Sequence, residues 1–314
     1  MKENRLDYMD VAKGIGIIAI ILGHSSIMFE RYVFPFHVPL FFLISGFFLS
    51  FRKPIAEYTK NKARQLLVPY CVTAMCVTIE KTVLNTVRGG NWASELLKSF
   101  LSAIYGSGSS SNKILFGIEP IGAIWFLLAL FTALICIRVI NSGRNSNILI
   151  LIALIAVSIL TTKIVWLPWS VQAGITASGY VLVGVYCKGI IRFDNIWIAL
   201  IGLLVYIAEV ITDTRVSVAS NRYGVYGFAA IGAVVICYSI VYICKLIGKI
   251  GPVKKVLSFL GRYTLPILCF HLVEITVFPW GHFNGFTNLI LLVCFPVLCV
   301  LVFKRFQIYK WIFR

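Results

Sequence analysis

The sequence predicts an all-α polytopic membrane protein with about ten transmembrane helices and both termini in the cytoplasm. Hydrophobic residues make up 59% of the 314 positions and charged residues only 13%, with a mean hydropathy of +0.90. A soluble domain carries about 25% charged residues, so a soluble globular fold is excluded. The number of helices and their orientation follow from the spacing of the apolar runs and from the distribution of Lys and Arg.

Ten apolar segments are long enough to cross the hydrocarbon core of a bilayer. They cover residues 11–29, 34–51, 66–86, 119–139, 147–163, 170–187, 195–212, 224–244, 264–280 and 286–303. Helix is the expected state, because backbone in contact with lipid must satisfy its own hydrogen bonds and no alternating strand pattern appears. Between the third and fourth segments, Trp92–Tyr105 mixes apolar and polar residues. We expect that stretch to lie along the membrane interface.

Lys and Arg are distributed unevenly between the connections. If the N-terminus is inside, twenty of them lie on the inner side and eight on the outer side, and Lys13 is the remaining one. Basic residues favour the cytoplasmic side, so both termini are predicted to be cytoplasmic and the helix count even. The net charge of +17 is spread between apolar runs without a basic block, so a nucleic-acid partner is not expected.

Cysteine and histidine spacing gives no sign of a metal site. The nine cysteines lie in or at the ends of apolar runs and form no CxxC pair, which is typical of small buried hydrophobic residues. The histidines have no HExxH or comparable spacing. We therefore expect neither a disulfide framework nor a bound metal ion.

Ionisable residues at membrane depth are costly and mark function by default. The stretch DVAKGIGIIAIILGHSS carries Lys13 and His24. Eleven steps of about 100° bring both side chains to one helix face, roughly 16 Å apart along the axis. Lys13 lies near the cytoplasmic end and His24 toward the outer end. The alternatives are that Lys13 reaches the interface by snorkelling and that His24 makes a hydrogen bond between packed helices.

Further histidines and acids gather toward the outer leaflet. His37 begins the second segment at a depth similar to that of His24, and the small pair Ser45 and Gly46 farther along allows close helix contact. In the ninth segment His271 and Glu274 are three residues apart and share a helix face. A carboxylate in that position can orient an imidazole and raise its basicity.

The remaining candidates have equally good structural interpretations. Glu209 in the seventh segment is either a second intramembrane carboxylate or an interfacial acid, and Trp125 beside Glu119 is either a site residue or an interfacial anchor. Lys62 and Arg64, just before the third long segment, can bind a phosphorylated cofactor or can simply be cytoplasmic topology charge.

Several blocks together resemble the integral-membrane acyltransferase 3 family, and most closely its fucose 4-O-acetylase-like branch. They are RLDYMDVAKGIGIIAIILGHSS, FHVPLFFLISGFF, KARQLLVPY, IWFLLALF and LGRYTLPILCFHLVEI, in order along nearly the whole chain. The resemblance implies about ten membrane helices in a bacterial plasma (inner) membrane. It also implies one membrane acyltransferase domain over residues 1–314, without the extracytoplasmic domain appended in longer members.

The resemblance also implies an activity and site residues. Family members move acyl groups, usually acetyl from acetyl-CoA, onto sugars of O-antigens, capsules and exopolysaccharides. The family's basic residue, ten intervening residues and histidine correspond to Lys13 and His24, although many members have Arg at the first position. Its Arg-x-x-Arg pair corresponds to the region of Lys62, Arg64 and Gln65, which departs from that pattern, so the resemblance does not imply a full bidentate phosphate clamp.

These implications define an expected mechanism. Acetyl-CoA docks against Lys13, Lys62 and Arg64, and His24 acts as general base or acyl relay on a hydroxyl of a carbohydrate acceptor, free or lipid-linked. The remaining candidates position the acceptor or the thioester: His37, His271, Glu274, Asp10, Glu119 and Trp125. Membrane lipids surround the protein. A transporter or flippase for lipid-linked sugars is the main alternative, although the chain lacks the duplicated halves typical of transporters. The other is a non-catalytic scaffold of a polysaccharide assembly complex.

Overall fold

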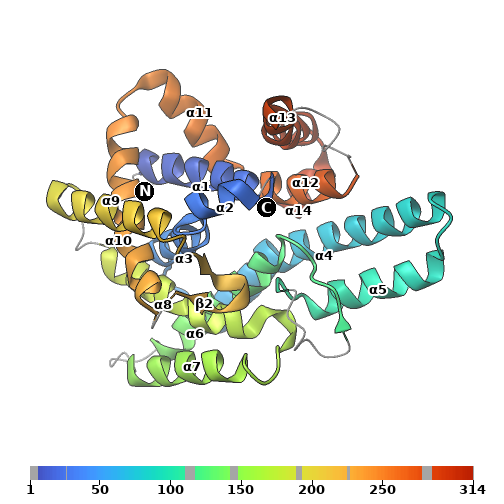
Figure 1. Cartoon of the computed structure of the whole chain (residues 1–314), viewed down its shortest axis with the longest axis horizontal. Helices are drawn as coiled ribbons and strands as arrows, with labels where there is room; N and C mark the ends of the chain where they lie inside the picture. Colours follow the sequence, from blue (N-terminus) through green and yellow to red (C-terminus); the bar gives the residue numbers. More distant parts are fainter. Residues whose placement is uncertain are drawn as a thin grey trace. The chain divides into compact units, whose positions relative to one another are not determined.

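The protein is helical almost throughout the residues that its computed structural model describes, which are 6–25, 27–109, 117–141, 148–188, 193–224, 227–277 and 285–313 (Figure 1). The strands within these ranges are β1 (Val216–Ser217) and β2 (Arg222–Tyr223), which pair antiparallel with Val216 opposite Tyr223. The prediction of an all-α fold is therefore confirmed, with this short hairpin as an addition.

A helix lies within or across each of the ten predicted apolar segments. These are α1 (Asp7–Ser25), α3 (His37–Phe47), α4 (Ile55–Val87), α6 (Trp125–Ile140), α7 (Ile148–Thr161), α8 (Val171–Cys187), α9 (Ile196–Ile211), α10 (Phe228–Ile247), α12 (Thr264–Val277) and α13 (Gly285–Phe303). The sequence pattern did not predict the short helices α2 (Ile27–Val33), α11 (Gly251–Arg262) and α14 (Gln307–Ile312), nor the 3₁₀ turns η2 (Pro168–Ser170) and η3 (Val218–Ser220). Helix α5 has the bounds expected for the interfacial stretch, Trp92–Tyr105.

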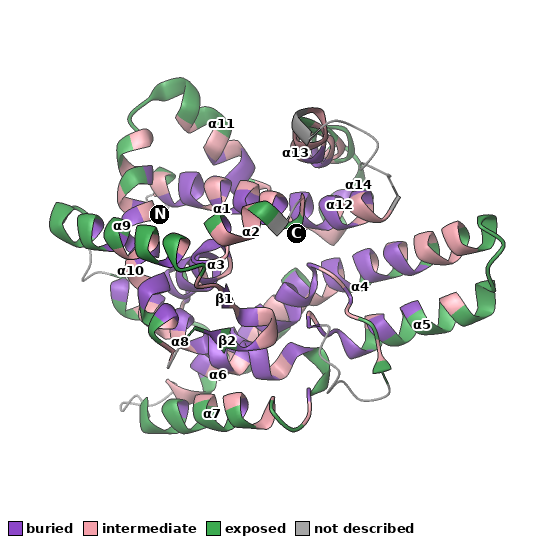
Figure 2. Ribbon diagram, viewed as in Figure 1, coloured by how far each residue is buried: buried purple, intermediate pink, exposed green. Residues whose placement is uncertain are grey.

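By length and composition, four helical stretches among the described residues can cross a membrane: α1, α4, η2 with α8, and α10. A fifth is added if α11 and α12 form one broken span. Large apolar side chains are exposed along α7 and α9 (Figure 2), among them Leu149, Trp197 and Leu204. Such surfaces are stable against lipid rather than water. The chain is thus a helical membrane protein, and the count of ten spans stays a prediction.

The chain forms two compact units whose segments alternate along the sequence. Unit 1 comprises Met1–Phe48, Tyr180–Val218 and Arg222–Ile267, and unit 2 comprises Leu49–Gly179, Ala219–Asn221 and Leu268–Arg314. Helices α8 and α12 each contribute residues to both units. Lys13, His24 and His37 therefore belong to unit 1, and Lys62, Arg64, His271 and Glu274 to unit 2.

Glycines allow the helices of unit 1 to pack with their backbones in contact. A Cβ atom on Gly14 of α1 would overlap the carbonyl of Leu257 in α11, and one on Gly261 would overlap the carbonyl of Asp10. Gly46 of α3 meets the carbonyl of Val181 in the same way, as its position beside Ser45 predicted. Small residues are the usual means of close helix contact where the hydrophobic effect cannot drive association. These contacts hold α1 and α3, the helices that carry Lys13, His24 and His37.

Unit 2 contains an antiparallel hairpin of α4 and α5. The turn between them ends at Asn91, whose side chain accepts hydrogen bonds from the backbone nitrogens of Ala93 and Ser94 and so caps α5. Farther along the hairpin, the hydroxyl of Tyr70 donates to the carbonyl of Ala103 at 2.6 Å. The turn follows the C-terminal end of α4, so the basic N-terminal end of α4 lies at the end of the hairpin away from the turn.

Candidate active site

Lys13 is held on α1 by a carboxylate and an aromatic ring. Its Nζ lies 3.7 Å from an Asp10 carboxylate oxygen, one helical turn earlier, and 4.9 Å from the centroid of the Phe48 ring. The Lys13 side chain is 27% exposed and that of Asp10 11%. The cation is therefore placed by partners within unit 1, and the Asp10 carboxylate touches Lys13 in this arrangement.

His24 lies in the last turn of α1 and its side chain is exposed. Its Nδ1 lies 2.7 Å from the carbonyl oxygen of Ile20. A carbonyl oxygen only accepts hydrogen bonds, so Nδ1 carries the proton and the basic lone pair of the neutral ring is on Nε2. The neutral ring is thus in a tautomer that can act as a general base through Nε2.

His37 begins α3 and is almost fully buried. Its Nδ1 donates to the carbonyl oxygen of Val33 at 2.8 Å, and its ring packs against that of Phe34, with 4.8 Å between the ring centroids. His24 and His37 lie within electrostatic reach of each other, as the similar depth of the two residues predicted. Both imidazoles in unit 1 therefore have the same tautomer, each set by a carbonyl four residues earlier.

The predicted phosphate-binding residues lie on the first turns of α4. The Nζ of Lys62 donates to the side-chain oxygen of Gln65 at 2.9 Å and lies 5.9 Å from the centroid of the Tyr58 ring. Arg64 is exposed. Gln65 stands in the region where the second arginine of the pair is expected, and it contacts Lys62 directly.

Arg138 and Tyr58 form a buried cluster that sequence reasoning missed. Arg138 lies in the last turn of α6. Its guanidinium carbon is 5.0 Å from the ring centroid of Phe51 and 5.1 Å from that of Tyr58. Its Nη2 donates to the carbonyl of Lys53 at 2.6 Å. In the sequence, Arg138 is one more cation at the cytoplasmic end of an apolar run. No local pattern distinguishes it, because its aromatic partners lie about 80 residues earlier in the chain.

His271 and Glu274 form the predicted pair on α12. Both side chains are fully buried in unit 2, and Nδ1 of His271 lies 3.6 Å from a carboxylate oxygen of Glu274. The distance is longer than a hydrogen bond but within the range of an ion pair. The spacing of three residues therefore brings the imidazole and the carboxylate together, as expected.

Glu119 and Trp125 have different surroundings. Glu119 is exposed, and its backbone carbonyl accepts a hydrogen bond from Ser102. Trp125 is buried at the start of α6, where its indole occupies the space in which a Cβ on Gly108 would lie. In unit 2 the indole thus packs against a glycine of the α5–α6 connection.

Glu209 is buried in unit 1 rather than paired with the charges that follow it. One of its carboxylate oxygens lies where a Cβ on Gly232 would be, so the absence of a side chain there makes room for it. Arg215 pairs instead with Asp213 at 3.0 Å and with Glu30 at 2.6 Å. The Asp213 carboxylate raises the pKa of Arg215, and the guanidinium in turn lowers the pKa of Asp213.

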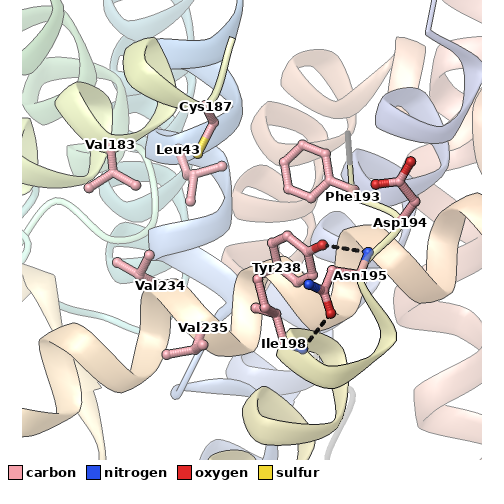
Figure 3. A pocket seen from close by; sticks show the side chains of 10 residues that line it. All are labelled: Leu43, Val183, Cys187, Phe193, Asp194, Asn195, Ile198, Val234, Val235 and Tyr238. Carbon is pink, nitrogen blue, oxygen red and sulfur yellow. Dashed lines mark hydrogen bonds between the residues drawn. The ribbon is translucent and has the colours of Figure 1, made fainter. Parts of the chain in front are cut away.

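A pocket of about 340 Å³ opens in unit 1 between α3, α8, α9 and α10 (Figure 3). The ring of Phe193 and the thiol of Cys187 line it, and the Tyr238 hydroxyl accepts a hydrogen bond from the backbone nitrogen of Asn195 at 3.0 Å. None of the residues predicted from sequence lines this pocket. Its lining is largely apolar, so it suits an apolar group.

No group of three or more His, Cys, Asp or Glu side chains is arranged to hold a metal ion within the ranges that the structure describes. The nine cysteines are free thiols. The described residues offer imidazole, carboxylate, ammonium, guanidinium, thiol and hydroxyl groups.

Comparison with known proteins identifies one family. A family model described as "Acyltransferase domain" matches residues 6–305. A nodulation protein, NolL, from Mesorhizobium japonicum is 30% identical over 168 residues. That match covers 48% of this chain and 40% of the nodulation protein. No solved structure matches the chain.

Proposed function

The chain belongs to the acyltransferase 3 family, and from that membership we propose that it moves an acetyl group from acetyl-CoA to a hydroxyl of a cell-surface carbohydrate. The acceptor is an O-antigen, a capsule, an exopolysaccharide or a lipid-linked precursor of one. The protein acts in the bacterial plasma membrane, with ten spans and both termini in the cytoplasm. A single membrane domain carries the reaction.

The observation that carries this proposal is the 2.7 Å contact between Nδ1 of His24 and the carbonyl oxygen of Ile20. The Ile20 carbonyl accepts the proton of Nδ1, so the basic lone pair of the neutral ring is on Nε2, the atom to which we assign general-base catalysis. His24 takes the proton of the acceptor hydroxyl as its oxygen attacks the thioester carbonyl. This attack forms the carbon–oxygen bond of the new ester. The C–S bond of the thioester then breaks, and His24 passes the proton to the departing thiolate of coenzyme A. In an acyl-histidine relay, Nε2 is itself the nucleophile.

The other site residues have supporting roles in this proposal. Lys13, Lys62 and Arg64 bind the phosphates of the donor as cations. Asp10 sets the position of Lys13, which agrees with the 3.7 Å contact between them. The remaining residues position the acceptor or the thioester of the donor. They are His37, Glu119, Trp125, His271 and Glu274. No metal ion takes part.

The test uses membranes that contain the wild-type protein, His24→Ala or Ser25→Ala. They are incubated with radiolabelled acetyl-CoA and carbohydrate intermediates of the source cell. We expect label in carbohydrate with the wild type and with the neighbouring control Ser25→Ala. A lost general base lowers the rate by about 10²–10⁴-fold, so His24→Ala should transfer almost none. Equal transfer by a folded His24→Ala protein contradicts the assignment of the base.

A further inference from the structure

We propose that Arg138, Tyr58 and Lys62 form an anion site in unit 2 that binds a phosphate group of the acyl donor. The inference rests on the proposed function for the identity of the donor. The anion site itself rests on the contacts of α4, α6 and the connection before α4. It supplies from α6 the arginine that the α4 motif lacks.

The first argument is an uncompensated buried charge. Arg138 is 5% exposed, and a buried guanidinium normally needs a carboxylate partner. No carboxylate lies within 4.0 Å of it among the described residues, and the nearby Glu57 pairs with Lys53 instead. The carbonyl of Lys53 and the C-terminal end of α6 supply only partial negative charges. Within the described part of the chain, no full negative charge therefore pairs with the Arg138 guanidinium.

The second argument is the presence of two hydrogen-bond donors without acceptors. Nε of Arg138 and the hydroxyl of Tyr58 are both buried, and neither has a hydrogen-bond partner among the described residues. Buried polar groups in native proteins are nearly always satisfied, and each exception needs an explanation. The ring centroid of Tyr58 lies 5.1 Å from the guanidinium carbon of Arg138, and we assign both unsatisfied donors to one bound anion.

The third argument is the chemistry of the assembled groups. The ring of Tyr58 is within cation–π distance of Arg138 and of Lys62. A planar guanidinium fork, an ammonium group and a phenol hydroxyl together suit the several oxygens of a phosphate. The Phe51 and Tyr58 rings and the Lys53 carbonyl fix the orientation of the guanidinium in advance, which lowers the entropic cost of binding.

Binding of unacylated coenzyme A measures this site without any acyl transfer. We would measure it by titration calorimetry on purified protein in nanodiscs of zwitterionic lipid. Arg138→Gln should weaken binding by roughly 10- to 100-fold, since hydrogen bonds to charged groups contribute about 1.5–3 kcal/mol. The affinity of Arg138→Lys for coenzyme A should lie between those of the wild type and Arg138→Gln, because lysine keeps the positive charge but lacks the guanidinium fork. The exposed Arg305→Gln in the same unit should bind like the wild type.

Tyr58→Phe separates a binding role from a structural one. The variant keeps the ring and removes only a hydroxyl that has no partner in the described fold, so its thermal stability should equal or exceed that of the wild type. We expect its affinity for coenzyme A to fall by roughly 3- to 10-fold. If stability is kept and Tyr58→Phe and the folded Arg138 variants bind coenzyme A as tightly as the wild type, the assignment of this site to the donor phosphate is refuted.

The remaining outcomes distinguish the sources of phosphate. If the wild type fails to bind coenzyme A, the donor named under the proposed function is wrong, and this inference falls with it. If coenzyme A binds equally to all variants, but only the wild type is stabilised by phosphatidylglycerol in the nanodisc, the site takes a lipid headgroup instead. That result overturns the donor assignment of the cluster while leaving the proposed function intact.

Discussion

At the scale of single residues, short-range hydrogen bonds decide which atoms can react. The carbonyls of Ile20 and Val33 fix the tautomers of His24 and His37. Each carbonyl belongs to the residue four positions before its histidine, close enough to accept a hydrogen bond from Nδ1. His271 differs, because its partner is the carboxylate of Glu274. The tautomers of His24 and His37 are therefore fixed by backbone carbonyls, whereas His271 lies beside the side chain of Glu274.

Asp213 gives a prediction of how stability depends on pH. Its pairing with Arg215 lowers the pKa of the folded-state carboxyl below the unfolded value of about 3.9. A depressed pKa contributes stability above the unfolded pKa, and that contribution is lost as the pH falls through the folded pKa. We expect the melting temperature of Asp213→Asn to lie below that of the wild type from pH 7 to about pH 5. The difference should shrink as the pH falls below about 4.

Asp194→Asn is the matched control for that measurement. Asp194 is an exposed acid in the same unit, and no ion pair involves it in the described part of the chain. Its substitution should leave the melting curve close to that of the wild type at pH 7. A constant difference between Asp213→Asn and the wild type down to pH 3 contradicts the assigned ion pair.

At the scale of elements, backbone contacts through glycine determine how α1 is held. Gly14 and Gly261 lie in the contact between α1 and α11, each against a carbonyl of the other helix. A methyl group there must separate the helices or distort their backbones, because no flexible side chain can move aside. The helix that carries Lys13 and His24 depends on α11, whose sequence contains no site residue.

Gly14→Ala should therefore destabilise the protein. Inserting an extra methyl group into a close-packed contact costs about 1–3 kcal/mol. Thermal unfolding in detergent, followed by intrinsic tryptophan fluorescence, measures the effect. Gly251→Ala is the control, since it lies on α11 itself and its added Cβ would meet no heavy atom within 4 Å. Equal melting temperatures for the two variants would show that α1 and α11 do not pack as described.

At the scale of the whole molecule, the membrane topology organises the proposed reaction. A donor made in the cytoplasm must meet cations on the inner side, and a surface carbohydrate must meet its base on the outer side. The exposed apolar residues of α7 and α9 agree with a bilayer around the protein. The unequal distribution of Lys and Arg is the evidence for its orientation.

Reporter fusions test that orientation. A fluorescent protein should fold and fluoresce when fused at either Met1 or Arg314, because both termini are predicted to be cytoplasmic. An epitope inserted between Gly89 and Gly90, in the exposed turn after α4, should be labelled from outside intact spheroplasts. External labelling of either terminus, or protection of the Gly89–Gly90 turn, contradicts the predicted topology.

Features that depend on periodicity along one segment could be predicted from the sequence. Apolar runs located the helices that lie within or across the ten predicted segments, because the lipid solvent leaves helix as the only state for such runs. The helical repeat placed Lys13 and His24 on one helix and His271 beside Glu274, since spacing along a helix fixes which side chains share a face. The set of blocks that resembles the family led to the membership that the comparison confirmed.

Contacts between elements could be decided only by the tertiary structure. Three such contacts join residues that are distant in sequence. Phe51 and Tyr58 pack against Arg138. Gly232 leaves room for Glu209, and Arg215 pairs with Glu30. Composition and period set the face that a helix presents, but not the helix that covers it. That choice depends on how side chains and backbones of separate helices fit together, and so the cluster around Arg138 emerged only from the folded chain.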